Sequence, residues 1–188
     1  MRYSGPGGVL QQRDAVGLIR FDEEVRTVIP PRARKIHWHR IVEALDEPGE
    51  GLASNAAGGL MRAASMISRP GMVVLISDLL MEPEVVADTL KGLAAAGHHL
   101  TVLQIMDPAE QNLDVAAIEA EFRDSETNQK MVAAVADVRE AYRTAVQETI
   151  DEWRGHLSGA AASHEVVLTD QPFGTPLRRA FMNRQVLP

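Results

Sequence analysis

The sequence predicts an α/β fold: a mostly parallel, Rossmann-like three-layer sandwich with an antiparallel edge hairpin. Two buried-type strands, 73–80 and 99–107, flank a helix over 83–97, and a third strand, 164–170, follows a long helix. Strands that alternate with helices indicate parallel pairing, because each helix provides the crossover between neighbouring strands. Two earlier strands, 14–21 and 25–31, are joined by a short link and therefore predict a hairpin.

The helices are predicted from apolar spacing and from the residues that end them. The segment 36–47 has apolar residues near helical spacing and is broken by PGEG at 48–51. A second helix follows Ser54 and ends at Pro70, with one apolar face: Ala57, Leu60, Met61, Ala64 and Ile67. Pro83 marks a helix start and Gly97 a helix end.

The two remaining helices lie in the C-terminal half of the chain. The long helix, 133–157, has apolar residues stepping by threes and fours, so we expect it to pack on the sheet rather than form a coiled coil. A last helix is predicted over 175–184. We expect residues 1–13 to form an irregular segment and residues 14–188 to form one domain.

Composition excludes several classes of protein. The chain has 188 residues, 45% of them hydrophobic, no cysteine and a formal net charge of −7. The missing cysteines rule out disulfides, a thiol nucleophile and Cys-ligated metals, and they fit a cytoplasmic protein. The negative charge argues against a nucleic-acid binder. No apolar run approaches the ~20 residues of a membrane span, and residues 1–12 do not read as a signal peptide.

Three clusters of polar residues could carry function, and each has a simpler explanation. His37 and His39 would share a face on a strand and could bind a metal, but a helix points them about 200° apart. We therefore expect exposed or capping histidines there and at 98–99. The basic stretch 30–40 could bind phosphate, yet a solvated face or a docking surface fits an acidic chain better. The acid-rich stretch 107–126 does not match a calcium loop and predicts an exposed excursion, with a docking surface as the second reading.

Acidic residues also follow the predicted parallel strands. The strand 73–80 contains Ser77 and Asp78, the next ends at Asp107, and the last ends at Asp170. Ligands bind at the carboxyl ends of strands in open α/β sheets. Each aspartate also fits as a cap of its own loop. No base or nucleophile accompanies them, and the chain has no G-x-S-x-G or P-loop sequence.

Several linked pieces, VGLIRFD, LISDLL, DPAE, DSET and TD, resemble one bacterial family over nearly the whole chain from Asp14 onward. It is the C-terminal, von Willebrand factor A-like half of proteins often encoded beside MoxR-type AAA+ ATPases, a family of unknown function. Such domains usually open with a D-x-S-x-S strand that provides three metal ligands. That sequence is absent here, so the resemblance implies that the first strand and helix are missing.

The resemblance implies a role for two residues of an incomplete metal-ion-dependent adhesion site. The family's loop threonine falls near Ser54, and its late aspartate matches Asp78. Because Mg²⁺ needs several oxygen ligands, we expect weak Mg²⁺ binding or none. The absent strand would leave a neighbouring strand edge open, to be closed by dimerisation, strand exchange or a covering element.

We therefore expect a non-enzymatic protein-binding module that partners a MoxR-type AAA+ ATPase in the assembly of protein complexes. Its docking surface would lie around the strand ends: Ser54, Asn55, Asp78, Asp107 and Asp170. The alternative is a metal-dependent hydrolase that uses Asp78, Asp107 and Asp170. A degenerate fragment without independent function is the third hypothesis.

Overall fold

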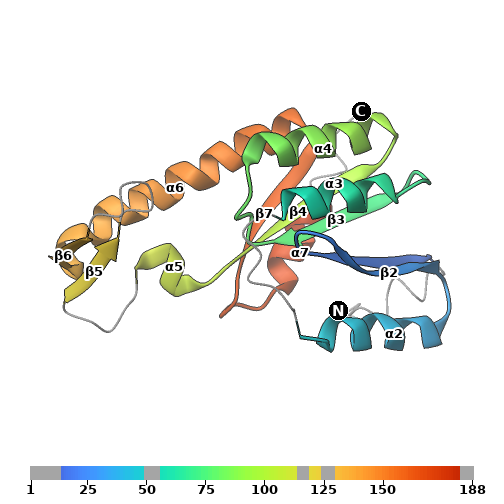
Figure 1. Ribbon diagram of the computed structural model, residues 1–188, viewed down its shortest axis with the longest axis horizontal. Helices are drawn as coiled ribbons and strands as arrows, with labels where there is room; N and C mark the ends of the chain where they lie inside the picture. The colour runs from blue at the N-terminus through green and yellow to red at the C-terminus, as the bar shows by residue number, and fades with distance from the viewer. Residues whose placement is uncertain (1–13, 49–55, 114–118, 124–129, 183–188) are drawn as a thin grey trace. The chain divides into compact units, whose positions relative to one another are not determined.

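The computed structural model describes residues 14–48, 56–113, 119–123 and 130–182, and Figure 1 shows the elements that they form. The chain divides into two compact units, Met1–Arg69 and Pro70–Pro188. The predicted irregular segment 1–13 lies outside the described residues, and a single domain over 14–188 stays a prediction.

The first unit contains a hairpin and two helices. The elements are β1 (Val16–Phe21), β2 (Val25–Arg32), α2 (Lys35–Asp46) and α3 (Ala57–Ser65). Ile29 of β2 packs against Ile41 and Ala44 of α2, with Val16 and Leu18 beside them. The hairpin is confirmed, because β1 and β2 pair antiparallel. Its predicted place at the edge of the parallel sheet is not seen, since the described residues show it as a separate two-stranded sheet.

The buried face of α3 includes Ala57 and Leu60, as predicted, but differs from the predicted face in its other residues. Gly59 and Ala63 are buried, whereas Met61 is exposed. The sequence AGGLMRAAS is apolar almost all round, so its periodicity does not identify one face. The close approach of the helix to the β1–β2 turn determines which face is buried. A Cβ added at Gly59 would overlap the carbonyl oxygen of Asp22, so only a face with a glycine at this position can lie against the turn.

The second unit is built on a parallel sheet. Its elements are β3 (Met72–Ser77), α4 (Pro83–Ala95), β4 (His99–Met106), α5 (Pro108–Asn112), β5 (Glu119–Arg123), β6 (Lys130–Ala134), α6 (Val135–Gly159), β7 (Ala162–Leu168) and α7 (Gly174–Met182). Three strands pair in the order β3–β4–β7, and both pairings are parallel. The α/β class and the predicted parallel sheet are therefore confirmed, and Gly97 follows α4 with a φ of 88°.

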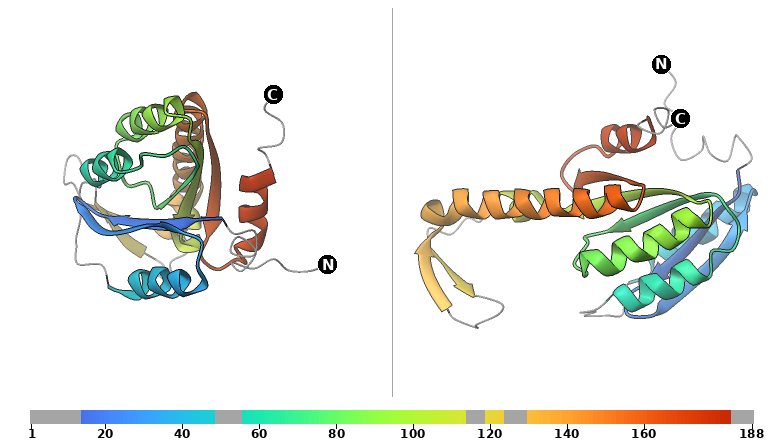
Figure 2. Two further views of the ribbon diagram at one scale, coloured as in Figure 1. Left: turned by 90° about the vertical axis from the view of Figure 1, so that its right-hand side faces the viewer. Right: turned by 90° about the horizontal axis from the view of Figure 1, so that it is seen from above.

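Helices cover this sheet from both sides. Ala180 and Leu177 of α7 pack on one face, against Leu103 and Val167. Figure 2 shows α4 and α6 together on the opposite face. Buried side chains of α4 include Val86 and Leu90. Aliphatic side chains therefore make up most of the core of this unit, in keeping with the low aromatic content of 4%.

The long helix α6 packs on the sheet along only part of its length. Ile150, Trp153 and Leu157 are buried. Toward its N-terminal end, Tyr142 and Val146 are half-buried, and their neighbours are exposed. None of the described helices is both long and apolar enough to cross a lipid bilayer.

Candidate functional site

The carboxyl ends of β3, β4 and β7 lie at one edge of the sheet because the three strands are parallel. Asp78 directly follows β3, Asp107 directly follows β4, and Asp170 comes two residues after β7. All three aspartates are exposed. The predicted site residues Ser54 and Asn55 lie outside the described residues. The structure thus places the described candidates at the predicted edge.

Asp78 stabilises a tight turn that follows β3. The predicted strand 73–80 ends at Ser77, because the chain turns there. Ser77 Oγ accepts a hydrogen bond from the Leu79 backbone N–H at 3.1 Å, and Asp78 Oδ1 accepts one from Leu80 at 3.3 Å. Leu79 has a φ of 61°, which is uncommon for any residue but glycine. Leu79 is buried, whereas Leu80 is 82% exposed.

Asp107 caps the helix that follows it. Its Oδ1 accepts a hydrogen bond from Ala109 N at 2.8 Å, and Glu110 Oε2 accepts one from Asp107 N at 3.3 Å. This reciprocal arrangement is a capping box, and Pro108 occupies the first helical position. The sequence DPAE therefore forms the N-terminus of a short helix. The other carboxylate oxygen of Asp107, Oδ2, accepts a hydrogen bond from Thr169 Oγ1 at 3.3 Å, and this bond links the ends of β4 and β7.

Among the described residues, no hydrogen bond joins the three aspartates into one cluster. Asp78 and Asp107 each accept backbone N–H groups of their own loops. No group of three His, Asp or Glu side chains in the described ranges could hold a metal ion. This arrangement gives the hydrolase hypothesis no support. The remnant metal site at Ser54 and Asp78 stays a prediction, because one of its two residues is not described.

A second exposed apolar side chain, after Leu80, follows the last strand of the sheet. Phe173, which follows β7 and Asp170, is 65% exposed. With Leu80, it places two large apolar side chains after the two outer strands of the described sheet. Sequence reasoning missed both. The apolar pair 79–80 was assigned to the strand, although a Ser–Asp pair is a turn signal that could have corrected the assignment.

The histidines have structural roles that were partly mispredicted. The helix over 35–46 is confirmed, but His37 is buried and its Nε2 donates to the Val16 carbonyl oxygen at 2.9 Å. His98 is also buried, so the expectation of exposed or capping histidines was wrong at both positions. Burial, followed by the charge of Arg154, lowers the pKa of His164 to about 4. Its Nε2 donates to Gln104 Oε1 at 3.0 Å.

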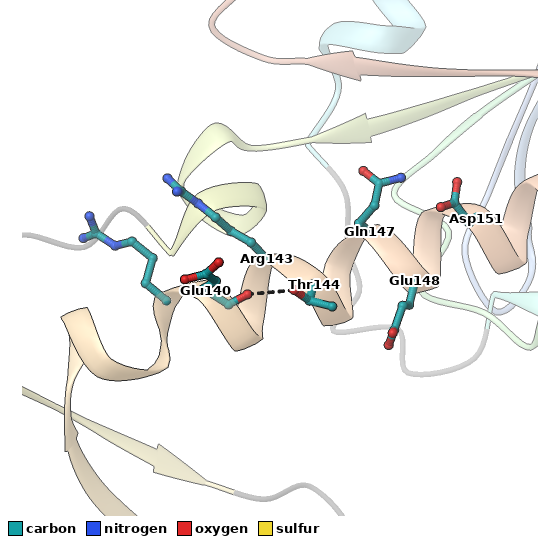
Figure 3. A pocket seen from close by; sticks show the side chains of 7 residues that line it. Glu140, Arg143, Thr144, Gln147, Glu148 and Asp151 are labelled. Carbon is teal, nitrogen blue, oxygen red and sulfur yellow. Dashed lines mark hydrogen bonds between the residues drawn. The ribbon is translucent and has the colours of Figure 1, made fainter.

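One hollow, with a volume of about 670 Å³, lies along the exposed part of α6. Seven polar residues line it: Arg139, Glu140, Arg143, Thr144, Gln147, Glu148 and Asp151. Figure 3 shows the labelled side chains projecting from one helix. Among the described residues, α6 alone provides the lining, so the hollow is an open surface rather than an enclosed active site.

Comparison with known proteins identifies one family and two distant structures. The family model described as "Protein of unknown function DUF58" matches residues 8–152. The conserved hypothetical protein BatB from Bacteroides thetaiotaomicron is 14% identical, with a TM-score of 0.48 over 96% of this chain and 83% of that chain. An aerotolerance-related membrane protein from Bacteroides fragilis NCTC 9343, with multiple mutations to serines, is 15% identical, with a TM-score of 0.47 over 92% of this chain and 80% of that chain. None of the curated proteins matches.

Proposed function

The chain belongs to the DUF58 family of proteins of unknown function, and we propose that it is a non-enzymatic protein-binding module. Its docking surface is the carboxyl edge of the β3–β4–β7 sheet. The partner is a MoxR-type AAA+ ATPase, and the shared task is the assembly of other proteins in the cytoplasm. The partner and the von Willebrand A-like character of the fold rest on the sequence resemblance through LISDLL and DPAE.

The exposure of Leu80 carries this proposal. An isolated exposed leucine is ordinary on a protein surface. Leu80 differs because a backbone of unfavourable geometry at Leu79 and two side-chain hydrogen bonds hold it in place. A left-handed non-glycine residue costs on the order of 1 kcal/mol, and such strain concentrates at ligand clamps and switches. The turn therefore presents an apolar anchor that is fixed before any partner arrives.

Other exposed side chains that follow the strands suit a protein partner. Phe173 provides a second anchor, and aromatic side chains are enriched at the centres of protein interfaces. Asp78, Asp107 and Asp170 provide an acidic rim. Opposite charges speed the encounter of two proteins and align them, so we expect a basic surface on the partner. Asp78 and Asp107 each cap their own loop and keep it rigid, which lowers the entropic cost of binding.

Binding between purified proteins tests the proposal. The chain is immobilised and titrated with a purified MoxR-type AAA+ ATPase, with and without ATP. Leu80→Ser and Phe173→Ser are each expected to weaken binding about tenfold or more, the range of an interface anchor. Ile36→Ser is the matched control, because Ile36 is 73% exposed but lies on α2, outside the strand ends. Equal affinity for all variants would refute the carboxyl edge as the docking surface.

Thermal melts with Mg²⁺ test the metal question separately. We expect the melting temperature to be unchanged by millimolar Mg²⁺, because a hard cation needs more oxygen ligands than Asp78 and Ser54 provide. A rise that disappears in Asp78→Asn would show that the adhesion site still binds a metal. In that case, docking through a shared metal ion would replace docking through apolar anchors.

A further inference from the structure

The outer side of β3 combines an open backbone edge with an apolar stripe. Within the described residues, β3 pairs with β4 alone. The Gly71 carbonyl oxygen accepts a hydrogen bond from His99 N at 2.9 Å, so the backbone groups of Gly71 point toward β4. Successive residues of a strand point their N–H and C=O groups to opposite sides. The backbone groups of Met72, Val74 and Ile76 therefore point away from β4.

The same three residues carry exposed apolar side chains. Met72 is 56% exposed, Val74 36% and Ile76 63%. Alternate residues share one face of a strand, so the three side chains form a continuous stripe. Leu75, on the other face, is buried. The helix α7 covers Leu103 and Val167 on the stripe's side of the sheet, but the stripe itself stays exposed.

This edge lacks the usual protection against strand addition. Edge strands commonly carry charged residues or other features that block pairing. The opposite edge strand of the described sheet, β7, contains Glu165, which pairs with Arg179. The sequence of β3, MVVLIS, contains no charge. Such an edge is a template for another strand.

We propose that the occupant is a second copy of this chain, whose β3 pairs antiparallel with β3 of the first about a two-fold axis at Val74. Val74 then lies opposite Val74 of the second copy, and Met72 lies opposite Ile76. All three residues have outward-pointing backbone groups, so each opposed pair exchanges both of its N–H···O bonds. Two-fold symmetry requires a self-complementary surface, and the stripe satisfies this requirement.

The charges at the ends of β3 favour this register. Arg69 precedes the strand and Asp78 follows it, and both are exposed. Antiparallel pairing about Val74 brings Arg69 of each copy to within one residue of Asp78 of the other copy. Opposite charges therefore meet at both ends of the pair. A parallel arrangement would instead bring each charge beside its own kind.

The helices leave room for this pairing. α4 packs on β4, so the two copies of α4 would cover strands that are three strand spacings apart. Three spacings amount to roughly 14 Å, whereas a helix with its side chains is ~10 Å wide. Pro70 has no N–H and precedes β3, so it limits the ladder to the segment between Met72 and Ile76.

Engineered cysteines test both the dimer and its register, because the native chain has no cysteine. In Val74→Cys the two thiols would be on opposed residues, whose Cα atoms are ~5.5 Å apart, within the range of a disulfide. We expect a covalent dimer of twice the 20.5 kDa chain mass under mild oxidation. Met72→Cys is the control, because its two copies would be roughly 13 Å apart or more. A mixture of Met72→Cys and Ile76→Cys should crosslink.

Charge substitutions test the same axis without oxidation. Light scattering of the native chain should give twice the chain mass. Val74→Lys and Val74→Glu should each give a monomer with native circular dichroism, and an equal mixture should recover the dimer. A monomeric native chain, a Val74→Lys dimer or equal crosslinking at residues 72 and 74 would overturn the proposal. Leu80→Ser should leave the dimer intact. The experiments therefore test the dimer surface independently of the carboxyl-edge docking surface.

Discussion

Gly58 and Gly59, adjacent residues of α3, should respond in opposite ways to the same substitution. A Cβ at Gly59 would overlap the Asp22 carbonyl oxygen and lie 3.0 Å from its carbonyl carbon. A Cβ at Gly58 would lie 3.7 Å from the Glu23 carbonyl oxygen, an ordinary contact. The atoms that Gly59 approaches belong to the backbone, so a side-chain rotation cannot relieve the overlap.

The β1–β2 turn has little freedom to move away from α3. Asp22 accepts hydrogen bonds from Arg26 Nε at 2.7 and 2.8 Å and from Glu24 N at 3.0 Å. The Arg26 guanidinium, followed by the backbone hydrogen bond, lowers the pKa of the Asp22 carboxyl group. The turn is therefore a fixed obstacle, and α3 would have to shift away from the hairpin.

The magnitude follows from two opposing effects. Alanine has a higher helix propensity than glycine by about 1 kcal/mol, and this gain is the same at both positions. Overpacking costs about 1–3 kcal/mol, and the overlap with backbone atoms points to the upper end. We expect Gly58→Ala to stabilise the first unit by about 0.5–1 kcal/mol and Gly59→Ala to destabilise it by about 2 kcal/mol. The difference, roughly 3 kcal/mol, isolates the steric cost.

The two tryptophans provide a unit-specific assay. Trp38 lies in α2 of the first unit and Trp153 in α6 of the second. In a Trp153→Phe background, fluorescence reports on Trp38 alone, so urea titration measures the free energy of unfolding of the first unit. If Gly59→Ala were as stable as Gly58→Ala, the close contact between α3 and the turn would not exist in solution.

Three further predictions concern the second unit. Asp107→Ala should lower its stability by about 1 kcal/mol in urea titration, because the capping box is lost, whereas Asp170→Ala should change it little. Protonation of His164 is favoured in the unfolded chain, since burial lowers its folded pKa from 6.5 to about 4. The contribution of neutral His164 to the free energy of unfolding is therefore complete above pH 6.5 and is lost as the pH falls toward 4. After a discount for solvent screening, we expect this loss to be about 1–2 kcal/mol in thermal melts across this pH range. The loss should be absent in His164→Gln. Leu157→Ala, at a fully buried position, should cost about 2–5 kcal/mol, whereas Leu80→Ala should stay within about 0.5 kcal/mol; equal denaturation midpoints would contradict the assigned burial.

Strong local patterns made most of the fold predictable. Apolar residues form continuous runs in β3 and β4 and recur at helical spacing along α6. These patterns can be recognised in the sequence because buried elements require apolar residues at those positions. Two elements in the acid-rich stretch were missed, although each had a signal. Asp107, Pro108 and Glu110 form a capping-box sequence, and EAEFR at 119–123 alternates polar and apolar residues.

The candidate site was less predictable, because exposure is a property of the tertiary structure. The strand ends placed Asp78, Asp107 and Asp170 at one edge through topology alone. The outward position of Leu80 depends on the left-handed backbone conformation of Leu79. A leucine does not predict this conformation, because it is typical of glycine and uncommon for other residues. His37 and His98 were misjudged for a similar reason, since burial is decided by neighbours that are distant in sequence.

The uneven packing of α6 gives a single helix two different local stabilities. Amide hydrogens near Ile150, Trp153 and Leu157 are covered by tertiary packing, so they exchange only when the sheet itself opens. Toward the N-terminal end, the backbone hydrogen bonds are backed by few buried contacts, and an unsupported helix is marginal in water. Local opening is therefore expected first in the mostly exposed stretch from Glu140 to Thr149, before Ile150 is reached. The packed half acts as a permanent nucleus from which the exposed half refolds without the cost of a new first turn.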